Sequence, residues 1–136
     1  MPKVKINNSQ GLVQENGGGV ALFGATETLV ANATAANAQI SATTSVALCT
    51  SADDAHHIQL PSITGLTTGH TIVISNVDQS QEFDLEVATN TTRINGVAAT
   101  PVKIDVKEKT VVTCVYSGAA NPGWIATVGD QATVPA

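Results

Sequence analysis

The sequence predicts an all-β fold, an antiparallel β-sandwich or jelly-roll-like small barrel with an extended N-terminal arm. Apolar and polar residues alternate with a period of two along residues 82–87 and 102–107, which is typical of half-buried antiparallel strands. Turn residues recur at intervals of about 8–12 residues, as they do in sandwiches and barrels. Charged residues make up only 12% of the chain, while Val, Ile and Leu are abundant, so disorder is not expected.

Residues 1–25 are expected to form the arm. Within them, residues 3–6 alternate charged and apolar side chains, as a short strand does. Gly17, Gly18 and Gly19 have no side chain to pack and allow a positive φ, so they predict a hinge or a hairpin tip. A phosphate-binding loop is not expected there, because no Lys-Ser or Lys-Thr follows the glycines.

The β-sandwich domain is expected to span residues 26–130, with a loose tail over residues 131–136. In residues 27–45 some apolar side chains fall at helical spacing, but scattered Thr and Asn weaken a helix, so strand and irregular structure are favoured. The more continuously apolar stretches 72–74 and 111–116 predict central strands, or strands covered on both faces.

Three short features refine this prediction. Pro61 predicts the end of a strand, because proline cannot donate to a ladder. Asn95 and Gly96 predict a tight turn with positive φ. Trp124, the single tryptophan, is predicted to cap one end of the core. The expected core residues are Leu60, Ile72, Ile74, Phe83, Leu85, Val87, Ile104, Cys114 and Trp124.

Charge and composition exclude several kinds of partner. A net charge of −5 with six basic residues supplies no basic stripe, so no nucleic-acid partner is expected. Two Phe, one Tyr and one Trp do not make a stacking platform for bases. No stretch approaches the run of about 18 apolar residues that spans a membrane, so no membrane partner is expected. The first residues lack the apolar centre of a signal peptide, which predicts synthesis in a cytoplasm.

Cys49 and Cys114 make no disulfide framework. In a reducing compartment they are expected to be buried, unpaired thiols, and a single bridge would require an oxidising one. Cys114 lies in mid-strand among apolar residues, where a thiol is inert. No serine is framed by a Gly-x-Ser-x-Gly elbow. We therefore predict no catalytic residue, no cofactor and no enzymatic activity.

One cluster, Asp53, Asp54, His56 and His57, has the residue types of metal ligands. Adjacent residues of a strand point to opposite faces, so the two histidines would not chelate one ion together. A polar turn that leads into a strand is favoured, and no metal site is predicted. His70 lies at the entrance of a strand and is expected to be exposed.

A second set of polar residues lies on one strand face. Glu82, Asp84 and Glu86 share that face, which is expected to be solvated. Lys103 and Lys107 of a neighbouring strand are their expected partners across the sheet. A shallow cation site on this face is the alternative.

Residues 46–128 resemble a small all-β module of tailed-bacteriophage structural proteins. The resemblance rests on a series of short strands and turns, and its most distinctive parts are Leu60-Pro61, Ile94-Asn95-Gly96 and Trp124. Modules of this kind occur in head-decoration proteins, which are also called capsid cement proteins, and in phage tail-fibre domains.

The resemblance implies a non-enzymatic viral structural protein of the virion. Its expected role is to decorate and stabilise the expanded phage capsid by binding the outer surface of the major capsid protein lattice. The expected partners are that protein and further copies of the chain, as a homotrimer or, second, a dimer. It would be made in the host bacterial cytoplasm and end on the capsid exterior.

The alternative is a tail-fibre module that binds a receptor or glycan. A chain that starts at Met1 and has 136 residues favours decoration over such a module, which usually sits within a longer chain. In the decoration setting the arm contacts the capsid, and Gly17, Gly18 and Gly19 form its hinge. The expected capsid-contact residues are Lys3, Lys5, Ile6, Leu12 and Val13.

Overall fold

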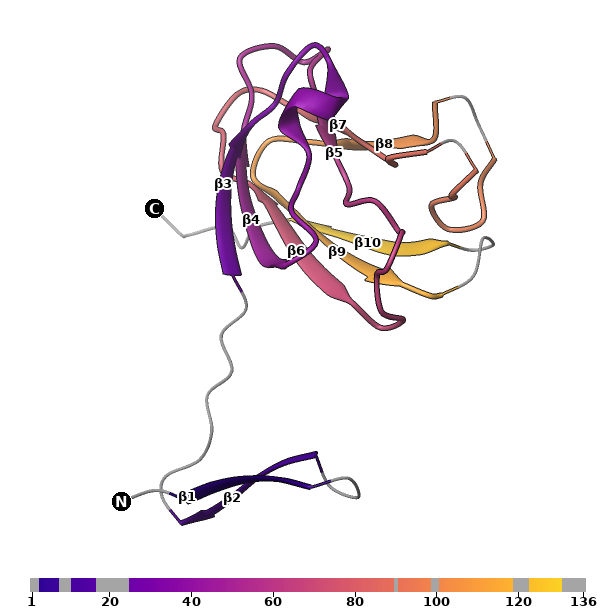
Figure 1. Ribbon diagram of the computed structural model, residues 1–136. Helices are drawn as coiled ribbons and strands as arrows, with labels where there is room; N and C mark the ends of the chain where they lie inside the picture. The colour runs from indigo at the N-terminus through magenta and orange to yellow at the C-terminus, as the bar shows by residue number, and fades with distance from the viewer. Residues whose placement is uncertain are drawn as a thin grey trace.

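The computed structural model describes residues 3–7, 11–16, 25–89, 91–98, 101–118 and 123–130, and for 3–7 and 11–16 it describes the backbone alone. The described chain forms strands and one short 3-10 helix (Figure 1). The elements are β1 (Lys3–Asn7), β2 (Gly11–Asn16), β3 (Ala25–Val30), η1 (Ala35–Ala38), β4 (Thr44–Thr50), β5 (His57–Gln59), β6 (Thr71–Asn76), β7 (Phe83–Glu86), β8 (Lys103–Val106), β9 (Thr110–Tyr116) and β10 (Trp124–Asp130). This confirms the predicted all-β class. No helix among these residues is long and apolar enough to cross a membrane.

The strands form three sheets. β1 and β2 make an antiparallel two-stranded sheet, a five-stranded sheet has the order β10-β9-β6-β4-β3, and a three-stranded sheet has the order β5-β7-β8. In the five-stranded sheet β10, β9 and β6 pair antiparallel, whereas β6, β4 and β3 pair parallel. In the three-stranded sheet β5 pairs parallel with β7, and β8 pairs antiparallel with β7.

The predicted purely antiparallel pairing is therefore wrong, because both larger sheets are mixed. The predicted barrel is wrong too, because neither sheet closes on itself. Period-two alternation places side chains on faces but carries no information on strand direction. The chain passes through η1 between β3 and β4, and through β5 between β4 and β6. These crossovers are long enough to return the chain for parallel pairing.

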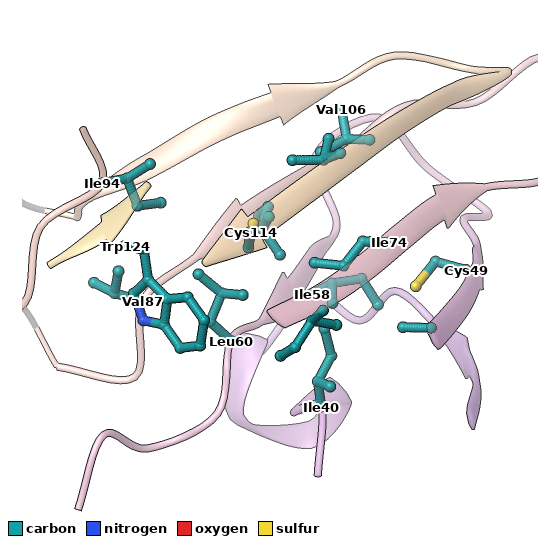
Figure 2. Close-up of a cluster of buried hydrophobic side chains, with 14 of the residues drawn as sticks. Ile40, Cys49, Ile58, Leu60, Ile74, Val87, Ile94, Val106, Cys114 and Trp124 are labelled. Carbon is teal, nitrogen blue, oxygen red and sulfur yellow. The ribbon is translucent and has the colours of Figure 1, made fainter. Parts of the chain in front are cut away.

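The hydrophobic core lies between the three-stranded sheet and one face of the five-stranded sheet (Figure 1, Figure 2). β6 and β9 occupy interior positions of their sheet, which confirms that 72–74 and 111–116 form central strands. On them Ile72, Ile74 and Cys114 are fully buried. Each large aliphatic side chain so buried contributes about 1.5–3 kcal/mol. The other predicted core residues, Leu60, Phe83, Leu85, Val87 and Trp124, are also buried, and only Ile104 is partly exposed.

Trp124 lies at one end of this cluster and Cys49 at the other, which confirms the predicted capping of the core (Figure 2). The Trp124 ring packs on Tyr116, with centroids 5.5 Å apart. The Trp124 backbone N–H donates to the Arg93 carbonyl at 2.8 Å, and its carbonyl accepts from Asn95 N–H at 2.8 Å. Trp124 therefore also joins residues 91–98 to β10.

The tight turn predicted at Asn95 and Gly96 is confirmed. Their φ angles are 51° and 76°, and the Val97 N–H donates to the Ile94 carbonyl at 3.0 Å. This is the conformation that favours Asn-Gly. The Asn95 side chain reaches β10, where its amide group pairs with the backbone N–H and carbonyl of Ala126 at 2.8 and 3.0 Å.

Other local predictions are confirmed in part. β5 ends at Gln59, two residues before Pro61. Residues 27–45 contain strand, a single 3-10 turn and irregular structure, as expected. The hinge glycines at 17–19 and the tail at 131–136 lie outside the described residues.

The two buried thiols are expected to lower the stability of the fold at alkaline pH. Cys49 and Cys114 are free and buried, as predicted. Burial raises the pKa of each thiol from 9.0 to about 12, and the negative charge of Glu27 adds to the effect at Cys49. Between these values the unfolded chain releases the thiol protons while the folded chain keeps them, so rising pH favours unfolding.

We expect the free energy of unfolding to fall between pH 7 and pH 10.5, by about 2 kcal/mol for each thiol. Urea denaturation at the two pH values measures this fall. A Cys49→Val/Cys114→Val variant shares every other titrating group, so its fall should be clearly smaller. Equal falls in the two proteins would contradict the assignment.

Two glycines allow the cost of a close packing contact to be separated from the cost of a positive φ. Gly65 and Gly123 have nearly the same φ, +75° and +74°, but a Cβ on Gly65 would meet nothing within 4 Å, whereas one on Gly123 would lie 2.5 Å from the Arg93 carbonyl oxygen. Gly65→Ala should therefore cost about 1 kcal/mol for its φ alone. Gly123→Ala should cost clearly more in urea denaturation, and equal losses would show that residues 91–98 do not pack on β10 as described.

Candidate functional site

The outer surfaces of the two larger sheets differ in chemistry. The three-stranded sheet carries a network of charged side chains, whereas the five-stranded sheet carries uncharged ones. Both surfaces follow from alternation, because residues between the buried positions of a strand must point away from the core. No pocket is found among the described residues. The candidate sites are therefore these two surfaces and the β1–β2 hairpin.

The polar cluster consists of His57 on β5, Asp84 and Glu86 on β7, and Lys103 on β8. In register, His57 is opposite Asp84 and Glu86 is opposite Lys103. The His57 Nδ1 atom lies 2.8 Å from Glu86 Oε1 and 3.4 Å from Asp84 Oδ2. The Lys103 Nζ atom lies 2.6 Å from the same Asp84 oxygen. Four side chains from three strands therefore meet at one point of the sheet.

Lys103 supplies the positive charge that these carboxylates need. The Asp84 side chain is only 11% exposed and the Glu86 side chain 15%, and a carboxylate at this burial is costly unless a cation or donor faces it. The hydrogen bond to Asp84 raises the pKa of Lys103, against a smaller effect of desolvation. A second ion pair joins Lys107 to Glu82.

The predicted cross-strand partners, Lys103 and Lys107, are thus confirmed. The prediction that the whole face is solvated is wrong for Asp84, which is buried. The reason is local crowding, because Asp84 lies between His57 and Lys103. The period of two placed Asp84 on the correct face but could not show what covers it.

Sequence reasoning missed His57 as a member of this cluster. The sequence did contain an indication of this position. Ile58 is buried and directly follows His57, so alternation places the His57 side chain on the outer, polar side of the strand. The missing information was the parallel pairing of β5 with β7. The polar turn expected before the strand is confirmed, because Asp53 Oδ1 accepts from the Ala55 N–H at 2.8 Å and Asp54 Oδ1 accepts from the Glu82 N–H at 3.0 Å.

His70 is half-buried, so its predicted exposure is wrong. Its carbonyl accepts from the Tyr116 N–H at 2.9 Å, and its N–H donates to the Thr67 carbonyl at 3.0 Å. These bonds hold the residue against the end of β9. The sequence around His70 gave no sign of this contact, because Tyr116 is distant from it along the chain.

His57, Asp84 and Glu86 are the described residues that could hold a metal ion, since one ligand atom of each lies within 4.8 Å of the others. An imidazole with two carboxylates would suit Zn²⁺ or Mn²⁺. The Lys103 ammonium group already contacts the Asp84 oxygen, so an ion would have to displace it. The geometry therefore favours a closed ion network that joins β5, β7 and β8.

We name the second surface the uncharged face. It consists of the side chains of the five-stranded sheet that point away from the core, all of them exposed or half-buried where the side chain is described. Its members are Thr26, Thr28, Val30, Val46, Leu48, Thr50, Thr71, Val73, Ser75, Val111, Thr113, Val115, Ile125, Thr127 and Gly129. No member carries a charge, and sequence reasoning missed this surface because it appears only once the strands are in register.

The hairpin of β1 and β2 contains all the predicted capsid-contact residues. Lys5 is opposite Val13 and Ile6 is opposite Leu12, while Lys3 begins β1. The backbone therefore brings these positions together on one small sheet, although they come from two stretches of sequence. The hairpin pairs with no other described strand.

Comparison of the chain with models of known protein families and with curated proteins finds no match. The functional argument therefore depends on the geometry of the surfaces described above.

The polar cluster makes a prediction about its two lysines. Lys103→Met removes the cation facing a buried carboxylate and should lower the free energy of unfolding by about 1 kcal/mol or less, because Lys103 is itself 41% exposed and screened by water. Lys107→Met removes a more exposed pair and should cost less. Because the pKa of Lys103 is raised above 10.5, its contribution to the free energy of unfolding is complete below pH 10.5 and is lost as the pH rises through the raised pKa.

Urea denaturation of the two variants at pH 7 and low salt makes the comparison. A larger loss in Lys107→Met than in Lys103→Met would contradict the central place of Asp84 in the network.

Proposed function

We propose that the chain is a non-enzymatic virion structural protein that decorates the expanded capsid of a tailed bacteriophage. In this proposal it binds the outer surface of the major capsid protein lattice as a homo-oligomer and stabilises that shell. The observation that carries the proposal is the hairpin of β1 and β2, a sheet of its own. A two-stranded hairpin is only marginally stable in water by itself, so a partner surface would stabilise it.

The residues of the hairpin fit such a contact. Lys3 and Lys5 are positively charged residues, and Ile6, Leu12 and Val13 are apolar residues. These residues are the proposed capsid contacts. The remaining strands form the body of the subunit, and we assign its two mixed sheets with a shared core to an open β-sandwich of jelly-roll type.

Stabilisation would come from mass action. A subunit that binds only the expanded shell stabilises it by about 2.7 kcal/mol per site when its free concentration is a hundred times Kd. An oligomer with several arms gains further, because the second contact forms at a high effective concentration. This mechanism needs no catalytic residue and no cofactor.

A tail-fibre module that binds a receptor or glycan is the alternative, and the described aromatic residues do not favour it. Glycan sites commonly present exposed aromatic rings to the sugar. Phe83, Tyr116 and Trp124 are instead buried in the core. Decoration is therefore the better-supported proposal.

The test is to add purified protein to undecorated expanded heads. We expect saturable binding and a higher rupture temperature. A variant lacking residues 1–19 should keep a β-type circular dichroism spectrum and its cooperative unfolding, but lose most of its affinity for heads. A second variant, Lys3→Glu/Lys5→Glu, keeps the full chain and should also bind more weakly.

Two outcomes would contradict the proposal. Full binding by the truncated variant would remove the hairpin from the contact. Failure of the intact protein to bind heads, together with binding to host cells or glycans, would favour the fibre-module alternative.

A further inference from the structure

We propose that the uncharged face is the interface between two copies of this chain, which pair face to face about a two-fold axis. The inference depends on the five-stranded sheet and not on capsid binding, and it names the surface that would join the copies of the proposed homo-oligomer. Four observations support it.

The first observation is the arrangement of apolar and polar residues on this face. Val46 and Val73 are opposite each other in register near its middle, and Leu48 and Val111 flank the next row. Thr26, Thr28 and Thr127 lie on the edge strands, whereas Ser75 and Thr113 lie within these two central rows. The centre of the face therefore mixes Val and Leu side chains with small hydroxyl side chains, and the former supply apolar area of the kind found in interface cores. Corner residues such as Val30 and Ile125 extend the apolar area to two ends of the face.

The second observation is electrostatic. The chain has a net charge of −5, so two copies repel each other at long range. The outer surface of the three-stranded sheet would bring carboxylates such as Asp105 of one copy near those of the other. The uncharged face brings no charge of either sign into contact, so it imposes no desolvation cost for ions and no like-charge contact. A partner of strong opposite charge would find no group there to recognise.

The third observation is size. Strands lie about 4.8 Å apart and residues on one face of a strand repeat every 6.7 Å or so, hence each outward residue covers roughly 32 Å². The uncharged face then measures about 500 Å² on each copy and about 1,000 Å² on both, which is the lower limit for a biological interface. Sheets pack face to face at about 10 Å, which side chains of Val and Thr size can fill.

The fourth observation is rigidity. Twelve of the fifteen members are β-branched Val, Thr or Ile, and three of the five strands are paired on both sides. Such side chains have few rotamers to lose on association. A rigid patch that meets its own copy gives an isologous contact, which closes as a dimer. A three-fold ring would need two different patches, so this surface favours the dimer over the homotrimer.

Sedimentation equilibrium of the full chain, over a range of micromolar concentrations, tests the inference. We expect the wild-type protein to form a dimer. Val73→Lys places a charge at the middle of the face and should weaken dimerisation at least tenfold. The matched control is Val97→Lys, since Val97 is 59% exposed and lies outside the face, and it should dimerise as the wild type does.

A mixing experiment separates the interface from a folding defect. Val73→Lys and Val73→Asp should each be monomeric with a β-type circular dichroism spectrum, and an equal mixture should recover a dimer, because opposite charges then meet near the axis. If both variants fail to fold, Thr28→Lys at the rim replaces them, and it should weaken dimerisation relative to the Val97→Lys control.

Three results would overturn the inference. They are a wild-type monomer at every concentration, an oligomer that no substitution on the face weakens, and an oligomer that Val97→Lys disrupts. A monomer that still binds phage heads would overturn this inference alone. A dimer that does not bind heads would overturn the proposed function and leave the inference standing.

Discussion

The packing of the five-stranded sheet against the three-stranded sheet is the interaction on which the rest of the structure depends. Ile72 and Ile74 of one sheet and Phe83 and Leu85 of the other are fully buried in the core they share. Successive residues of a strand point to opposite faces, so burying one alternate set fixes the position of the other. The polar cluster and the uncharged face are both consequences of this division. Their different chemistry suggests different roles, with internal ion pairing on one side and association on the other.

The features that could be predicted from the sequence are those set by near neighbours in the chain. Alternation over 82–87 correctly predicted burial of Phe83 and Leu85, since the pattern depends only on strand geometry. The Asn95-Gly96 turn was predictable because few residues accept a positive φ. Burial of Trp124 followed from its size and apolar character. Each of these predictions needed only a few consecutive residues.

The features that could not be predicted depend on pairing between distant strands. The parallel alignment of β5 with β7 brings His57 to Asp84 and Glu86, and no local pattern contains that alignment. The crossovers that make both sheets mixed are likewise invisible to a period of two. The uncharged face is the clearest case, because its rows combine residues from β3 to β10 and exist only when five strands are in register. Threonine and valine scattered along the chain gave no reason to group them.

One measurement tests the whole account most directly, a high-resolution electron cryo-microscopy reconstruction of phage heads saturated with the protein. The account predicts density for the β1–β2 hairpin on the outer surface of the capsid. It also predicts two copies of the domain related by a two-fold axis, with their five-stranded sheets facing each other at about 10 Å. Domains bound with the uncharged face open to solvent and the polar cluster against the capsid would contradict the account, as would heads without added density.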